Sequence, residues 1–262
     1  MSTFSDVDAS PRPQDLIDYL DQAHSGLHSP KQRLRQGLPV GPGDRVLDLG
    51  CGAGHELAHL EEDGILAVGV DTSAVMLHAS RSRLTDQDLP ARLARADGAR
   101  LPFRDGAFDA CRIERVLQHV ADPAAVLAEA RRVLRPGGTL GVSEPDWASF
   151  TLASADPEAA AAVTAQVGTQ IAQRAIGRQL RRLLVDAGFG SVRIEVELAV
   201  YRTLEELDLV ISLRRAAERA CAAGRLTERR AAELIAEQRD LSQRGGFHAT
   251  LNRSVLAWAV QV

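Results

Sequence analysis

The sequence has little of several features that would define a class of protein. Its three cysteines, Cys51, Cys111 and Cys221, lie far apart and lack the spacing of a metal site, so we interpret them as reduced thiols. No apolar run approaches the roughly 18 residues that span a bilayer, and residues 1–13 lack a signal-peptide pattern. These absences predict a cytoplasmic protein without a membrane partner.

Lysine is almost absent as well. Lys31 is the only lysine among 31 basic residues, and the formal net charge is -4. A chain with this charge has no general attraction for a phosphate backbone, so nucleic acid is not an expected partner. The arginine bias is typical of a GC-rich bacterial genome. A hydrophobic content of 45% over 262 residues is sufficient for a large buried core.

Short apolar segments alternate with helical ones through the first half of the chain, which predicts a parallel sheet covered on both faces. The predicted strands are 45–49, 66–71, 91–95, 108–113 and 139–144, and the helices between them are 54–62, 73–85 and 123–134. Pro136-Gly137-Gly138 forms a sharp stop before the fifth strand. The fold class is therefore α/β, with a doubly wound, mostly parallel sheet of seven strands.

The remaining segments complete this sheet and add helices. We expect helices at 14–38 (one or two), 157–175, 178–187 and 204–243, and an antiparallel pair of strands at 191–201 and 248–262. The predicted organisation is an N-terminal tail with helices (1–40), a cofactor-binding core (41–148) and a completing region (149–262) with helical lid insertions, mainly 157–187 and 204–246. Ligands bind beyond the carboxyl ends of strands in such folds, so the lid is expected there.

A glycine-rich turn directly follows the first predicted strand and opens a helix. It contains Gly50, Gly52 and Gly54, which allow a ligand to lie against the backbone. Asp71 ends the next strand, 21 residues after Gly50, where a carboxylate can accept hydrogen bonds from ribose hydroxyls. The combination predicts a nucleoside ligand, although a purely structural turn also explains the glycines.

The glycine spacing counts against a dinucleotide. A dinucleotide fingerprint would place its third glycine at position 55, which is His55, and Glu56 would repel a pyrophosphate at the helix N-terminus. A sulfonium joined to a zwitterionic amino acid is a better guest. A nicotinamide-dependent oxidoreductase and a non-catalytic nucleoside-binding protein stay open as alternatives.

Five ordered motifs carry a resemblance to a known family. They are Val46 to Gly54, Gly69-Val70-Asp71-Thr72-Ser73, Ala96-Asp97-Gly98-Ala99-x-Leu101-Pro102-Phe103, Phe108-Asp109 and Leu134-Arg135-Pro136-Gly137-Gly138. Over residues 40–148 the chain resembles the class I S-adenosylmethionine-dependent methyltransferases, particularly the ubiquinone-biosynthesis-like group that acts on small molecules. The resemblance implies a Rossmann-like fold, S-adenosylmethionine as cofactor, S-adenosylhomocysteine as product, and methylation of an O, C or N atom of a small-molecule acceptor, which we place in bacterial secondary metabolism.

By position, the resemblance also implies the residues that hold the cofactor. The implied set is Asp48, Gly50, Cys51, Gly52, Asp71, Thr72, Met76, Asp97, Gly98, Ala99 and Glu114. Asp71 would hold the ribose, and Asp97 would accept from the adenine amino group. Met76 and Leu101 would flank the adenine ring. Asp48 has the alternative role of fixing the turn, and Met76 that of packing in the core.

His119 follows the fourth predicted strand, where resembling enzymes line the methyl-transfer end of the pocket. A histidine there can act as a base near neutral pH, and the alternative is that it packs the turn before Asp122. The predicted substrate-binding residues are Tyr19, His119, Asp146, Trp147, Arg178 and His248. The expected partners are the acceptor and, as an open alternative to a monomer, a second copy of the chain.

Residues 55–59 read His-Glu-x-x-His, which literally matches a zinc signature. Two observations argue against a metal. The segment begins the helix that the glycine turn needs for its cofactor, and no third ligand follows within the next dozen residues. We therefore expect no metal site.

Overall fold

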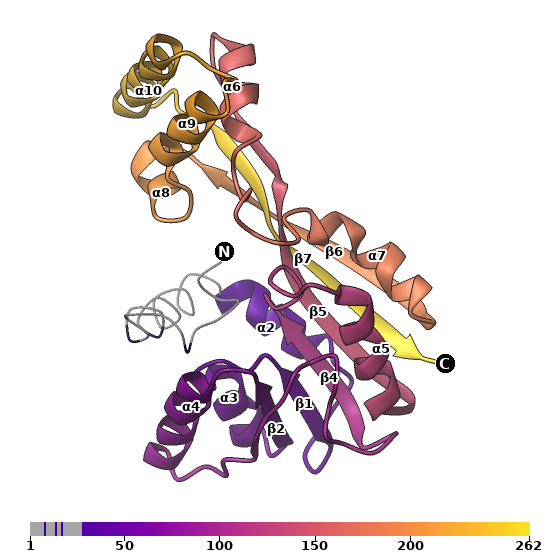
Figure 1. Ribbon diagram of the computed structural model, residues 1–262. Coiled ribbons are helices and arrows are strands. Elements are labelled where there is room, and N and C mark those ends of the chain that lie inside the picture. The colour runs from indigo at the N-terminus through magenta and orange to yellow at the C-terminus, as the bar shows by residue number, and fades with distance from the viewer. Residues whose placement is uncertain (1–7, 9–13, 15–16, 18–27) are drawn as a thin grey trace.

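The computed structural model describes residues 8, 14, 17 and 28–262 (Figure 1). In this part of the chain, one sheet has the strand order β3-β2-β1-β4-β5-β7-β6. The strands are β1 (Arg45–Leu49), β2 (Leu66–Asp71), β3 (Leu93–Arg95), β4 (Phe108–Glu114), β5 (Leu134–Leu152), β6 (Phe189–Tyr201) and β7 (Ala249–Gln261). β7 runs antiparallel to both of its neighbours. The predicted doubly wound, mostly parallel α/β sheet of seven strands is confirmed, including its antiparallel β6–β7 pair.

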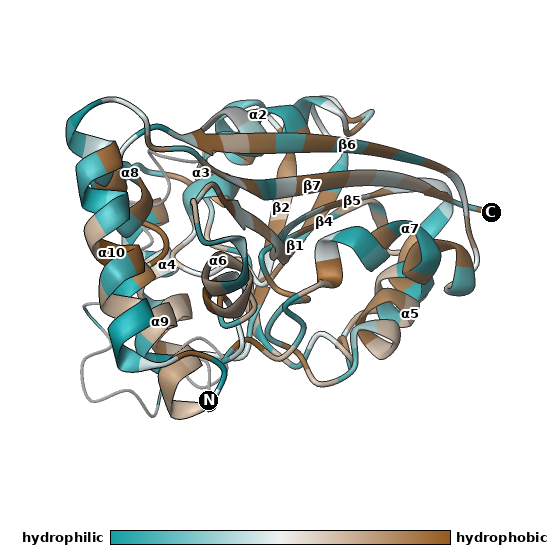
Figure 2. Cartoon of the chain, turned by 90° about the horizontal axis from the view of Figure 1, so that it is seen from above, coloured by the Kyte–Doolittle hydropathy of each residue, from teal (hydrophilic) through white to brown (hydrophobic). Residues whose placement is uncertain are grey.

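Helices cover both faces of the parallel half of the sheet. Their bounds are α2 (His28–Gln36), α3 (His55–Glu62), α4 (Ala74–Asp86), α5 (Pro123–Val133) and α7 (Ile176–Asp186). Viewed from above, α2 lies on one side of the sheet and α5 and α7 on the other (Figure 2). The apolar residues of β1, such as Leu47 and Val46, point alternately into the two cores below these helices. This packing fixes the carboxyl ends of β1, β2 and β4 side by side.

The second half of the sheet is longer than the sequence predicted. The fifth strand was expected at residues 139–144, but β5 spans Leu134–Leu152 and continues past Pro145. Its pairing with β7 shifts between Glu144 and Asp146, so the proline lies at a bulge, where it need not donate a hydrogen bond. β5, β6 and β7 thus extend beyond the cofactor half of the molecule (Figure 1).

The extended strands carry a separate group of helices (Figure 1). These helices are α6 (Pro157–Thr164), α8 (Leu204–Asp208), α9 (Leu213–Ala222) and α10 (Glu228–Gln243). The predicted helical stretch 204–243 is divided at Ser212 and Thr227, whose side chains cap the helices that follow. The four helices share an apolar core with Phe150 and Leu251 of the long strands. We refer to them as the helical cluster.

One predicted helix is much shorter than expected. Residues 157–175 were predicted as a single helix, but α6 ends at Thr164. Gly168 has φ +71, and a side chain there would place Cβ 2.6 Å from Trp147 Cβ. The chain therefore turns sharply and residues 165–175 descend toward the sheet. Among residues 28–262, no helix has the length and apolar composition to cross a membrane.

Candidate functional site

A cavity of about 740 Å³ lies at the carboxyl ends of β1, β2 and β4. Most of the sequence-predicted site residues line it. The predicted residues in its wall are Asp48, Gly50, Cys51, Gly52, Asp71, Thr72, Met76, Asp97, Gly98, Glu114, His119 and Trp147. Ala99 and Leu101 are not in its wall. The cavity lies where the strand order reverses between β1 and β4, the usual binding position in open α/β sheets.

The glycine turn between β1 and α3 forms the floor of the cavity. Gly50 has φ +77, and a side chain there would place Cβ 2.2 Å from Val116 Cγ2. Gly54 also has a positive φ, and a Cβ there would lie 2.3 Å from Ser80 Oγ. The turn therefore requires glycine both for its backbone conformation and for its close neighbours. Its backbone remains open to the cavity.

Asp71 joins this turn to the end of β2. One carboxylate oxygen accepts from the Gly52 N–H at 3.0 Å, and the other accepts from the Ser73 N–H at 2.9 Å. Burial raises the pKa of Asp71. Each oxygen keeps a further lone pair, so the carboxylate can also accept from two hydroxyl groups. Ser73 caps α4 and thereby places Met76, which is almost fully buried, against the cavity.

Asp97 occupies the next loop, after β3. Its carboxylate accepts from the Ala99 N–H at 2.9 Å and is otherwise exposed. This contact gives Ala99 a role in orienting Asp97. Gly98 packs closely against Leu49, because a Cβ at this position would lie 3.0 Å from Leu49 Cδ2. Asp71 and Asp97 therefore line the same cavity from adjacent strand ends.

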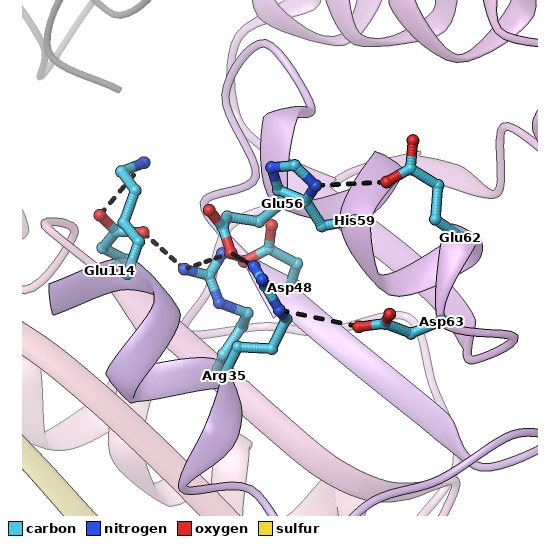
Figure 3. A network of polar contacts seen from close by, with 9 residues as sticks. Arg35, Asp48, Glu56, His59, Glu62, Asp63 and Glu114 are labelled. Carbon is cyan, nitrogen blue, oxygen red and sulfur yellow. Dashed lines mark hydrogen bonds and ion pairs between the residues drawn. The ribbon is translucent and has the colours of Figure 1, made fainter. Parts of the chain in front are cut away.

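A buried ion-pair network lies beneath the methionine end of the predicted cofactor site (Figure 3). Arg112, on β4, is only 2% exposed and contacts Asp48 at 2.8 Å and Glu114 at 2.5 Å. Lys31 contacts Glu114 at 3.2 Å, and Arg35 contacts Glu56 at 3.1 Å. Three cations and three carboxylates thus meet from α2, β1, α3 and β4. Such a network fixes orientation more than it adds net stability.

The network shifts the pKa values of its members in different directions. Burial raises the pKa of Asp48 to about 6, against the opposing pull of Arg112. Glu56 is also buried, but Arg112, Lys31 and Arg35 together lower its pKa to about 2. Burial raises the pKa of the Cys51 thiol, which makes it a packing residue of the floor rather than a nucleophile.

Lys31, Glu56 and Arg112 also line the cavity, although none of them was predicted as a site residue from the sequence. A signal was present for Arg112, because a charged residue inside an otherwise apolar strand needs buried partners. Glu56 was considered only within the zinc-like motif. In the structure it pairs with arginines, and His59 contacts Glu62 at 3.3 Å. Among the described residues, no group of three His, Cys, Asp or Glu is placed to hold a metal ion.

The far end of the cavity is formed by a tight turn after β4. Arg115 has φ +55, which is uncommon for a residue with a side chain. Glu144, fully buried on β5, holds the turn by accepting from the Val116 and Leu117 N–H groups at 2.7 and 2.6 Å. The Arg115 N–H donates to Ser143 at 2.9 Å. These contacts fix a strained backbone conformation beside the predicted acceptor site.

His119 ends this turn and lines the cavity. Burial, together with the neighbouring Arg115, lowers its pKa to about 4. The imidazole is therefore neutral at physiological pH and can accept a hydrogen bond, but it is a weak base. Trp147 lies nearby, with its indole N–H donating to Gln118 Oε1 at 2.8 Å.

Residues 165–175 close the same end of the cavity. The single helix predicted over residues 157–175 did not place them there. Gln170 and Ile171 line the cavity, and the Gln173 N–H donates to the Gln118 carbonyl at 3.0 Å. A glycine inside an alanine-rich stretch, at Gly168, was the available signal for this break.

The structure does not bring the other predicted substrate residues into the cavity. Asp146 is buried and accepts from Arg178 at 2.6 Å, so these two residues pair with each other at the start of α7. His248 is exposed just before β7. Neither this pair nor His248 lines the cavity wall. Tyr19 lies outside the described residues, as do most of the predicted N-terminal tail and most of the first half of the helical segment predicted at 14–38.

The chain shares its central region with known proteins. Residues 47–142 match the family model described as a methyltransferase domain. The chain is 42% identical to an uncharacterized 37.1 kDa protein of transposon Tn4556 from Streptomyces fradiae, covering 81% of this chain and 63% of that protein. It is 44% identical to a demethylmenaquinone methyltransferase from Beutenbergia cavernae, covering 43% of this chain and 47% of that enzyme. The chain thus spans less than two thirds of the length of these relatives.

Solved structures share the fold. The YcgJ protein from Bacillus subtilis superposes with a TM-score of 0.61 at 17% identity, covering 89% of this chain and 98% of that one. Phosphoethanolamine N-methyltransferase 2 from Haemonchus contortus, solved with S-adenosyl-L-methionine, gives 0.53 at 18% identity, covering 89% and 52%. The sheet order and the matched domain together define a class I S-adenosylmethionine-dependent methyltransferase. Residues 47–142 are a domain of this family, and through this domain the chain is related to the demethylmenaquinone methyltransferases.

Proposed function

We propose that this protein transfers the methyl group of S-adenosylmethionine to an oxygen, carbon or nitrogen atom of a small molecule. The observation that carries the proposal is one cavity that joins the glycine turn, Asp71 and Asp97 to the turn that bears His119. One end presents hydrogen-bond acceptors that can bind an amino acid and a nucleoside. The other end of the cavity, at the turn that bears His119, leaves space for a second molecule.

The residues of the cavity fit the cofactor in chemical terms. Asp48 Oδ2 is buried and has no hydrogen-bond partner among the described residues, so it can accept from the cofactor ammonium group. Asp71 has a lone pair free on each oxygen for the ribose hydroxyls. Asp97 uses one oxygen for the Ala99 N–H, which leaves the other for the adenine amino group.

When bound, S-adenosylmethionine supplies an electrophilic methyl carbon on a sulfonium. The protein then has to hold the acceptor nucleophile in line with that carbon and its sulfur. His119 is neutral near pH 7 and can accept the hydrogen of an acceptor hydroxyl or amine. In this proposal His119 orients the nucleophile, and its weakness as a base does not prevent transfer.

The helical cluster and residues 165–175 are the proposed cover of the acceptor end. In this view residues 41–148 bind the cofactor, and residues 149–262 complete the sheet and supply the lid. Gln170 and Ile171 support the assignment because they already line the cavity. The lysine-poor composition and the Streptomyces relative support a bacterial acceptor, which we place in secondary metabolism. A homodimer stays a prediction.

Calorimetric titration with S-adenosylhomocysteine tests the cofactor assignment. Micromolar or tighter binding, with no heat from NAD, is the expected result. Asp71→Asn should weaken S-adenosylhomocysteine binding by about 1 to 3 kcal/mol, because it weakens the hydrogen bonds to the ribose. Asp88→Asn is the matched control, since Asp88 is exposed and has φ +55, which asparagine tolerates. Equal affinities of the two variants, or binding of NAD alone, would exclude the proposed site.

A further inference from the structure

The two ends of the cavity carry opposite charge. Five carboxylates line the cofactor end, against two cations, Lys31 and Arg112. The carboxylates are Asp48, Glu56, Asp71, Asp97 and Glu114. The described residues that line the acceptor end include one ionised side chain at neutral pH, the guanidinium of Arg115, because His119 is neutral there. A cationic cofactor suits the first end, and an anionic acceptor suits the second end.

Arg115 also differs from the other buried or half-buried arginines of the site in its partners. Arg112 and Arg35 each contact carboxylates within 4 Å. Arg115 contacts no carboxylate at that distance among the described residues, and its guanidinium lies 5.8 Å from the centre of the Trp147 ring. The charge of Arg115 opposes the rise in the pKa of Glu144 that burial causes, but no ion pair joins the two side chains. The half-buried guanidinium therefore retains the capacity to bind a carboxylate through two parallel hydrogen bonds.

The backbone around Arg115 is held in a conformation that needs compensation. Arg115 has φ +55, a left-handed conformation that is unfavourable for a residue with a side chain. Glu144 and Ser143 hold this turn through three backbone N–H groups, and Gly50 packs directly against Val116. The arginine is therefore presented to the cavity by a rigid support that also touches the cofactor turn.

Apolar groups surround this single cation. Trp147 and Ile171 line the wall beside it, together with Val116 and Val120. Trp147 is 8% exposed and is oriented by its hydrogen bond to Gln118. A ligand that matches this end combines one negative charge with an apolar, planar body that can lie on the indole.

From these observations we infer that the methyl acceptor is a small aromatic or conjugated carboxylic acid whose carboxylate pairs with Arg115 and whose ring lies against Trp147. The inference rests on the proposed function, because it identifies the acceptor of that reaction. Arg115 is then the specificity-determining residue. It fixes the acid group at one end of the acceptor, so that a nucleophile elsewhere on the molecule faces the methyl group.

The test compares acids with their neutral amides. The protein is first saturated with S-adenosylhomocysteine and then titrated with benzoate, 4-hydroxybenzoate and indole-3-acetate, each against the corresponding primary amide. We expect at least one acid to bind on the order of tenfold more tightly than its amide. Arg115→Gln should abolish this difference, and Arg115→Lys should retain part of it because the charge remains. Arg225→Gln is the matched control, since Arg225 is exposed and outside the cavity wall.

The outcomes separate this inference from the proposed function. Failure to bind S-adenosylhomocysteine would overturn the proposed function and the inference with it. Normal S-adenosylhomocysteine binding would leave the proposed function standing. The titrations with acids and amides would then decide whether Arg115 binds the acceptor carboxylate. Equal binding of acids and amides, no binding of any acid up to about 10 mM, or an acid preference that survives in Arg115→Gln would each overturn the inference.

Discussion

Glu144 provides the sharpest test of the electrostatics of the site. The side chain is fully buried, and burial raises its pKa from 4.5 to about 8, although Val116 and Leu117 donate backbone N–H groups to it. Its second oxygen has no partner among the described residues. We therefore expect Glu144 to be protonated in the folded protein at neutral pH and ionised in the unfolded chain.

This difference makes stability depend on pH in a defined direction. Between pH 4.5 and 8 the folded state keeps a proton that the unfolded state has lost, so the free energy of unfolding falls as pH rises. A rise from 4.5 to about 8 corresponds to about 5 kcal/mol at full ionisation. Glu144→Gln removes the ionisable group but keeps an acceptor oxygen. The variant should match the wild type near pH 5 and exceed its stability by several kcal/mol at pH 9.

Urea denaturation at pH 5, 7 and 9 measures this difference directly. The matched control is Glu228→Gln, because Glu228 is exposed in the first turn of α10 and should change stability by no more than about 0.5 kcal/mol at any pH. A Glu144→Gln variant that is less stable than the wild type at pH 9 would refute the reasoning. It would mean that the backbone N–H groups hold an ionised carboxylate.

Two further predictions concern the turns. Gly50→Ala should abolish S-adenosylhomocysteine binding, because its Cβ would lie 2.2 Å from Val116, whereas Gly43→Ala, at φ +89 with nothing within 4 Å, should cost only about 1 to 2 kcal/mol of stability and leave binding intact. Similar binding defects in both would contradict this account. His119 should titrate near pH 4 by NMR, and Arg115→Gln should raise that value; a midpoint near 6.5 in the wild type would exclude the burial and charge that we describe.

The parallel half of the fold could be predicted because its signals are local. Strands β1 and β2 have the predicted bounds, since short apolar runs there end at glycine or at polar loop residues. The strand expected at 91–95 is shorter, because only Leu93–Arg95 pairs with β2. The length of β5 was not predictable in the same way. Pro145 ordinarily ends a strand, and only the bulge opposite β7 allows β5 to continue.

The cofactor end of the site was more predictable than the acceptor end for a related reason. Its residues follow strands at fixed spacings, so position in the sequence gives position in space. Two of the partners of Arg112, Asp48 and Glu56, come from other elements, and no local sequence pattern predicts these contacts. Asp146 and Arg178 were expected to contact the substrate, but they are close enough to neutralise each other. Pairing between distant side chains is decided by tertiary packing.

The scarcity of lysine has a practical consequence. Lys31 is the only lysine in the sequence. It lines the cavity, and its amine lies 3.2 Å from a carboxylate oxygen of Glu114. An acylating reagent selective for amines therefore has one lysine target, which is only 16% exposed and engaged in an ion pair. The extent of its modification, read by mass spectrometry, will follow the occupancy of the cavity. Lys31 can thus serve as a chemical reporter of the occupancy of the cavity.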